Sequence, residues 1–87
     1  MGGEALSIEK PSIAQIKAAR ALLGWSQDDL AKRSGVSEPT IGRLEAQGGE
    51  LGGRPATGDK LRRALEKAGI EFTNGNAPGV RLRSKKA

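Results

Sequence analysis

The sequence of 87 residues predicts a small, mainly α-helical domain that ends in a pair of short β-strands. Between residues 12 and 69, apolar side chains recur at helical spacing, and Ser or Thr precedes these repeats while Gly follows them. Two later segments, residues 70–73 (IEFT) and 80–83 (VRLR), alternate apolar and polar residues as strands do. The linker between them, NGNAPG, is rich in turn-forming residues. The length leaves room for one domain with a modest core.

The composition argues against several classes of function. The chain has no Cys and no His, so disulfides and the usual zinc ligands are absent, which fits a reducing cytoplasm. No apolar run approaches a membrane span, and the first residues lack a signal-peptide core. The only aromatic residues, Trp25 and Phe72, are too few for the stacking platforms of single-strand binders. With no nucleophile–base pair visible, we expect a cytoplasmic protein that is not an enzyme and needs no cofactor.

The net charge of +5 favours a polyanionic partner. Residues 1–59 carry seven basic and eight acidic side chains, whereas residues 60–87 carry eight basic and two acidic ones. The excess therefore lies late in the chain, where it predicts contact with phosphates. A solvated basic surface without a ligand is the alternative.

The chain divides into four segments. Residues 1–11 are polar and glycine-containing, and we expect a flexible N-terminal arm; residues 84–87 form a short basic tail. Between them lie the helical domain, residues 12–69, and the strand pair, residues 70–83. The first helix is predicted to be capped by Ser12 and ended by Gly24, and Trp25 to cover the junction that follows. Arg20 lies on the apolar face of this helix, an awkward position for an unpaired charge.

Residues 26–47, SQDDLAKRSGVSEPTIGRLEAQ, predict two short helices joined by a tight turn. Ser26 and Asp29 have the spacing of a capping box, Gly35 can end the first helix, and Ser37 can cap the second. In the second helix, one side is apolar and the opposite side is small, polar and basic, formed by Pro39, Gly42, Arg43 and Ala46.

This stretch closely resembles the helix-turn-helix motif of the phage-repressor and Cro-like (XRE) regulators. The match is carried by Gln27, Leu30-Ala31, Gly35-Val36-Ser37, Thr40-Ile41 and Leu44-Glu45, with Ile16, Arg20, Leu23 and Gly24 upstream. Downstream it continues more loosely to about Gly69, so that it covers roughly two-thirds of the chain. The resemblance implies a repressor-like DNA-binding bundle of four to five helices, whose recognition helix, about 38–47, enters the major groove of double-stranded DNA. The C-terminal β-hairpin is added to that bundle.

The resemblance also implies roles for residues outside the recognition helix. Gln27 and Ser37 match positions that bind phosphates, although both also suit the start of a helix. Arg54 lies in a glycine-rich loop where relatives contact the DNA backbone, but this loop carries a single basic residue. Arg20 resembles an arginine that pairs with a glutamate late in the recognition helix, here Glu45. The alternative is an exposed Arg20 that touches DNA.

Five residues of the recognition helix are candidates for reading DNA. Glu38 could accept a hydrogen bond from cytosine or simply suit the helix dipole, and Pro39 could touch a thymine methyl group. Thr40 could bond a base edge or a phosphate. Arg43 is the strongest candidate, because its planar fork matches guanine or, failing that, phosphate. Gly42 indicates either a close approach of DNA or neutral variation, since glycine within a helix costs about 1 kcal/mol.

Two expectations concern the end of the chain. We expect Thr57 to cap a last helix that Gly69 ends; the P-loop-like outline of residues 53–60 lacks both the motif's Lys-Ser/Thr ending and a preceding strand. The hairpin must either pack on the helices or pair with a second copy, because an isolated hairpin is marginal.

These observations predict a sequence-specific, double-stranded DNA-binding transcriptional regulator that acts as a homodimer. Two alternatives stay open: an antitoxin that represses its own gene, and an adaptor that uses the same fold to bind a protein partner.

Overall fold

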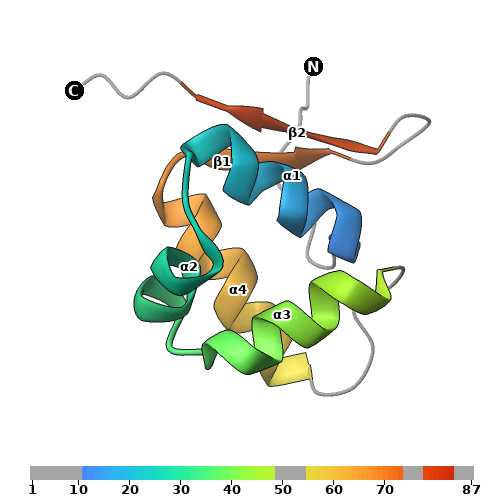
Figure 1. Ribbon diagram of the computed structural model, residues 1–87. Helices are drawn as coiled ribbons and strands as arrows, with labels where there is room; N and C mark the ends of the chain where they lie inside the picture. The colour runs from blue at the N-terminus through green and yellow to red at the C-terminus, as the bar shows by residue number, and fades with distance from the viewer. Residues whose placement is uncertain (1–10, 49–54, 74–77, 84–87) are drawn as a thin grey trace.

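The computed structural model describes residues 11–48, 55–73 and 78–83 (Figure 1). It contains helices α1 (Ile13–Leu23), α2 (Gln27–Ser34), α3 (Glu38–Gln47) and α4 (Pro55–Lys67), followed by strands β1 (Ile70–Thr73) and β2 (Gly79–Leu82). The hairpin lies over α1 on one side of the bundle, and α3 lies on the opposite side. The expected fold class, a mainly α bundle with a C-terminal hairpin, is confirmed. The basic tail, Arg54 and nearly all of the expected N-terminal arm fall outside the described residues.

Local capping defines the first three helices. Ser12 and Gln15 form a capping box at the start of α1, as Ser26 and Asp29 do at the start of α2. The Ser37 hydroxyl accepts from the Thr40 amide at the start of α3. Left-handed glycines end α1 and α2, Gly24 with φ of 71° and Gly35 with φ of 79°. These five sequence predictions of helix ends, Ser12, Gly24, Ser26, Gly35 and Ser37, are confirmed.

The predicted start of the last helix was wrong. We expected Thr57 to be the cap, but α4 begins two residues earlier, at Pro55. Proline suits the first helical position because its φ is fixed near the helical value and the first amides have no partner within the helix. Thr57 therefore lies in the first turn, where a hydroxyl is tolerated but does not cap.

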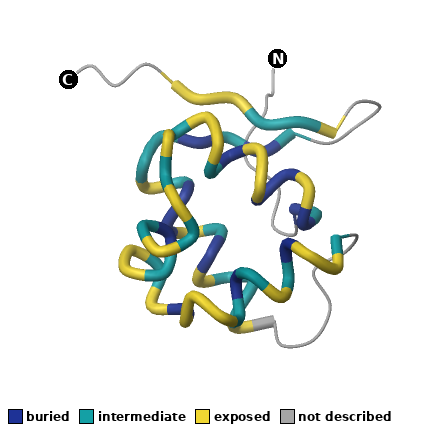
Figure 2. The backbone as a smooth tube through the Cα atoms, viewed as in Figure 1, coloured by how far each residue is buried: buried dark blue, intermediate teal, exposed yellow. Residues whose placement is uncertain are grey.

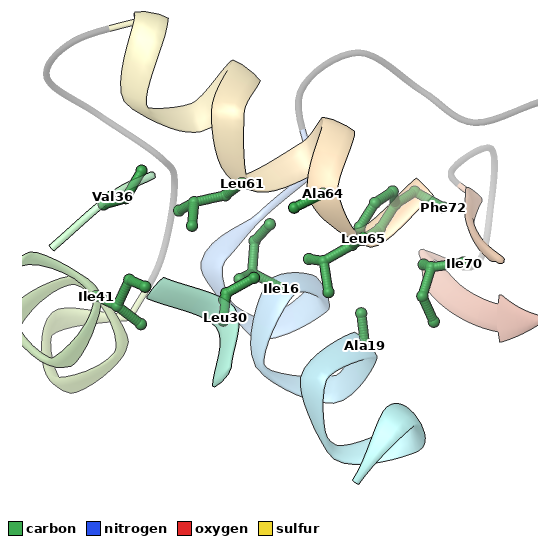
Figure 3. Close-up of a cluster of buried hydrophobic side chains, with 10 residues drawn as sticks. All are labelled: Ile16, Ala19, Leu30, Val36, Ile41, Leu61, Ala64, Leu65, Ile70 and Phe72. Atoms are coloured by element: carbon green, nitrogen blue, oxygen red, sulfur yellow. The ribbon is translucent and has the colours of Figure 1, made fainter. Parts of the chain in front are cut away.

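The core lies where the four helices and β1 meet (Figure 3). Leu30 of α2 and Leu65 of α4 are fully buried, and Phe72 of β1 closes the core under the hairpin. The remaining members are Ile16, Ala19, Val36, Ile41, Leu61, Ala64 and Ile70. Figure 2 shows that the buried positions face the interior of the bundle, whereas the outer side of α3 is exposed. Within the described part of the chain, no helix is long and apolar enough to cross a membrane.

The hairpin packs on the helices of its own chain. The strands are antiparallel, with Ile70 opposite Leu82 and Phe72 opposite Val80, so these four side chains share one face as expected. Gln15 fastens the hairpin to α1: its Nε2 donates to the carbonyl oxygens of Thr73 at 2.7 Å and Gly79 at 2.9 Å. Burial decreases along β2: Val80 is half-buried, and Leu82 is 39% exposed.

Candidate nucleic-acid interface

An ion pair fixes α3 against α1. The guanidinium of Arg20 forms a two-pronged contact with Glu45, with Nε 2.9 Å from Oε2 and Nη2 2.7 Å from Oε1. Nη1 of the same arginine donates to the carbonyl oxygen of Trp25, at 2.9 Å. The Glu45 side chain is only 4% exposed and that of Arg20 18%. The pair therefore ties the recognition helix and the α1–α2 junction to one point.

The environment of Glu45 favours its charged form. Burial alone would raise the pKa of Glu45, but hydrogen bonds from Arg20 and Gln27, with the charges of Arg20 and Lys17, outweigh burial and lower the pKa. The hydrogen bond to Glu45 in turn raises the pKa of Arg20 against the opposing effect of burial. The pair is therefore fully ionised at neutral pH.

Gln27 joins this network and accounts for Gly42. Its Nε2 donates to Glu45 Oε1 at 3.0 Å, so at least one of its amide hydrogens is used inside the protein. A Cβ at Gly42 would lie 3.3 Å from Gln27 Oε1, closer than most such contacts. An alanine at this position would therefore press on the flexible end of the Gln27 side chain, a contact that neither sequence interpretation of Gly42 contained. A phosphate contact by Gln27 stays a prediction.

The outer face of α3 presents the other candidates to solvent. Glu38, Pro39 and Arg43 are exposed, as is Ser37 just before the helix, and Thr40 is half-buried. Ser37 and Thr40 are linked by a 2.8 Å contact between their hydroxyl oxygens. Among the described residues, Arg43 has no hydrogen-bond or ion-pair partner. As far as the described residues go, the face therefore offers the unpaired guanidinium of Arg43 beside short polar and apolar groups.

Much of the basic charge expected to face phosphates is paired within the protein. Arg62 lies between Asp59, at 2.5 Å, and Glu66, at 2.9 Å, and its side chain is 19% exposed. Arg81 and Arg83 both reach Glu71 on β1, at 2.5 Å and 3.4 Å. The count of basic and acidic residues in residues 60–87 therefore overstated the number of cations that are free to bind phosphate. A count cannot show which basic side chains are paired with a carboxylate.

Trp25 covers the junction between α1 and α2, as the sequence indicated. Its ring packs against the core, half-buried, and the guanidinium carbon of Arg33 lies 4.5 Å from the ring centroid. Among the residues that the structure describes, Arg33 thus contacts the Trp25 ring and pairs with no carboxylate. Neither residue lies on the outer face of α3.

Sequence reasoning missed Gln15 altogether. This side chain contributes to the α1 cap and also holds both strands of the hairpin, whose contact points lie 58 and 64 residues further along the chain. The one signal available was a polar residue beside Ile16 on the apolar side of the first helix. That signal does not identify the partner.

A capped helix pair joined by a tight turn, with the second helix held at its base and open on its outer face, defines a helix-turn-helix protein. A helix-turn-helix family model, HTH_3, matches residues 16–73, about two-thirds of the chain. The chain belongs to the XRE/Cro-like helix-turn-helix family, a family of DNA-binding regulators. No curated protein matches it.

Proposed function

We propose that this protein is a sequence-specific transcriptional regulator that inserts α3 into the major groove of double-stranded DNA. The observation that carries the proposal is the contrast between the two sides of α3. Its inner side is fixed by Ile41 and the Arg20–Glu45 pair, while its outer side leaves Arg43 without a partner among the described residues. A rigid helix with a free guanidinium is suited to reading base edges.

The neighbouring groups suit a supporting role. Ser37 and Thr40 offer hydroxyls at the start of α3, where the positive end of the helix dipole also attracts phosphate. Pro39 offers an apolar surface and Glu38 an acceptor, the complement of a thymine methyl group and a cytosine amino group. Such readers act as dimers on inverted half-sites about one helical turn apart, so we also propose a homodimer.

The test begins with selection of the preferred site from random duplex DNA. Arg43→Ala should then weaken binding to that site by about 1–3 kcal/mol and relax the preference at one base pair per half-site. Lys67→Ala, which removes the same charge from the last turn of α4, is the matched control and should leave the base preference unchanged. If Arg43→Ala weakens binding to selected and random DNA equally, Arg43 contacts phosphate and does not read a base.

A further inference from the structure

Within the described part of the chain, strand β2 is an edge strand: it pairs with β1 on one side and has no strand on its other side. The Arg83 amide donates to the Gly69 carbonyl oxygen at 2.9 Å, which sets the alternation of the ladder. By that alternation, the backbone N–H and C=O groups of Arg81 point towards β1. The backbone N–H and C=O groups of Val80 and Leu82 point away from β1.

The face of β2 that carries Leu82 continues onto α1. Leu22 follows Gln15 by seven residues, about two helical turns, so it lies on the side of α1 that faces the hairpin. Gln15 donates a hydrogen bond to Gly79, so these two residues mark a common point of α1 and β2. Leu82 lies about 10 Å beyond Gly79 along the strand. Leu22 lies about the same distance beyond Gln15 along the helix. Both segments run in the same direction from that anchor (Figure 1). Leu22, 48% exposed, and Leu82, 39% exposed, thus lie at one corner, and they are the large exposed apolar side chains of the described residues.

We propose that β2 pairs antiparallel with β2 of a second copy, with the two-fold axis at Arg81. In this register Val80 of each copy lies opposite Leu82 of the other, and the outward groups form about four hydrogen bonds between the copies. A two-fold axis at Val80 would instead place Leu82 opposite Pro78, which has no N–H to donate. This deepens the homodimer of the proposed function, on which it rests, by naming the surface and its register.

The partner that we propose for the edge of β2 is a second copy of this chain, because the edge can pair with an identical edge around a two-fold axis. The pairing extends the sheet to four strands and brings Leu82 and Leu22 of both copies towards the two-fold axis, where their exposed apolar surface is covered. Arg81 meets its counterpart across the axis, but each is paired with Glu71 of its own chain, which reduces the repulsion. A short strand pairing of this kind falls below about 1,200 Å² of buried surface, so the dimer is weak alone and gains from two adjacent half-sites.

The absence of cysteine from the chain permits a test of the register. Opposite residues at a non-hydrogen-bonded pair have Cα atoms about 4.5 Å apart, within the range of a disulfide. Under mild oxidation without DNA, R81C should cross-link to itself at least about tenfold more than R83C, whose two copies would lie about 13 Å apart. Both variants should cross-link equally in denaturant. Equal cross-linking under native conditions, or more by R83C, overturns the proposed register.

A second variant tests the pairing without cysteine. L82P removes an N–H that points away from β1, so the hairpin keeps its internal ladder while the contact between copies loses donors. Sedimentation of the full chain without DNA should show a dimer that L82P dissociates at least about tenfold more readily, with thermal unfolding as the check on the fold. A dimer unchanged by L82P, or a monomer up to millimolar concentration, overturns the pairing. Binding of both proteins to a duplex with one half-site is measured separately, so failure of the dimer and failure of DNA binding are distinguishable.

Discussion

Glu45→Ala is expected to destabilise the fold strongly without touching the outer face of α3. The substitution removes the acceptor of both prongs of Arg20 and of the Gln27 amide. Arg20 stays charged, because arginine does not lose its proton in proteins, and it keeps one hydrogen bond, to the Trp25 carbonyl oxygen. A largely buried guanidinium is thus left without its counter-ion.

The burial of the pair sets the size of the effect. Breaking a buried pair by removing one partner costs about 3–5 kcal/mol. Glu45 meets that condition, with a side chain 4% exposed, but Arg20, at 18%, can recover part of its hydration. We therefore expect a loss of about 3 kcal/mol in the free energy of unfolding, at the lower end of that range. In a domain of this size, such a loss lowers the Tm by about 12–24 °C.

Chemical and thermal denaturation of matched variants measure this loss. Glu38→Ala is the control, since it removes an exposed carboxylate from the first turn of the same helix and should cost about 1 kcal/mol or less. Arg20→Met and the double variant complete a cycle in which the two losses should not add, because removing both charges leaves neither unpaired. Additive losses, or a Tm for Glu45→Ala within about 4 °C of the wild type, would refute the role assigned to the pair.

Three further outcomes follow from the same contacts. The pKa of Glu45 is lower in the folded protein than in the unfolded chain, so the stability that the Glu45 carboxylate contributes is complete above about pH 5 and is lost as the pH falls through the folded pKa. Denaturation at several pH values should show that the difference in stability between the wild type and Glu45→Gln becomes smaller on acidification. Ser37→Asp keeps a good helix cap but adds a negative charge, so stability should hold within about 0.5 kcal/mol while DNA affinity falls in binding titrations; unchanged affinity would remove Ser37 from the phosphate contacts. Gly42→Ala should gain part of the roughly 1 kcal/mol of helix propensity, and more of it in a Gln27→Ala background, because the atom it crowds ends a flexible side chain; destabilisation in both backgrounds would contradict this account.

The features that the sequence predicted correctly are those determined within a few residues. A serine three positions before a backbone amide can cap a helix, and a glycine can adopt the left-handed conformation, whatever the rest of the chain does. Ser26, Gly35 and Ser37 were therefore placed correctly. The predicted cap at Thr57 was wrong although it also rested on a local signal. Both Thr57 and Pro55 are typical of a helix start, and the helix begins at Pro55. The pairing of Arg20 with Glu45 came from the family resemblance, since the two residues lie 25 positions apart.

The sequence could not show which charges remain free, and this affects how DNA binding is understood. The basic excess of residues 60–87 predicts a broad phosphate-binding surface, yet Arg62 is held by Asp59 and Glu66, and Arg81 lies on the hairpin beside Glu71. Figure 1 places that hairpin on the opposite side of the bundle from α3. A phosphate contact by Arg81 would therefore need a second DNA segment or a different docking geometry. In the proposed complex, the base preference depends on Arg43 and the start of α3, while the hairpin acts on affinity by joining two copies. L82P, which leaves every charge in place, should accordingly change the oligomeric state before it changes the base preference, an order that a general electrostatic role for residues 60–87 would not produce.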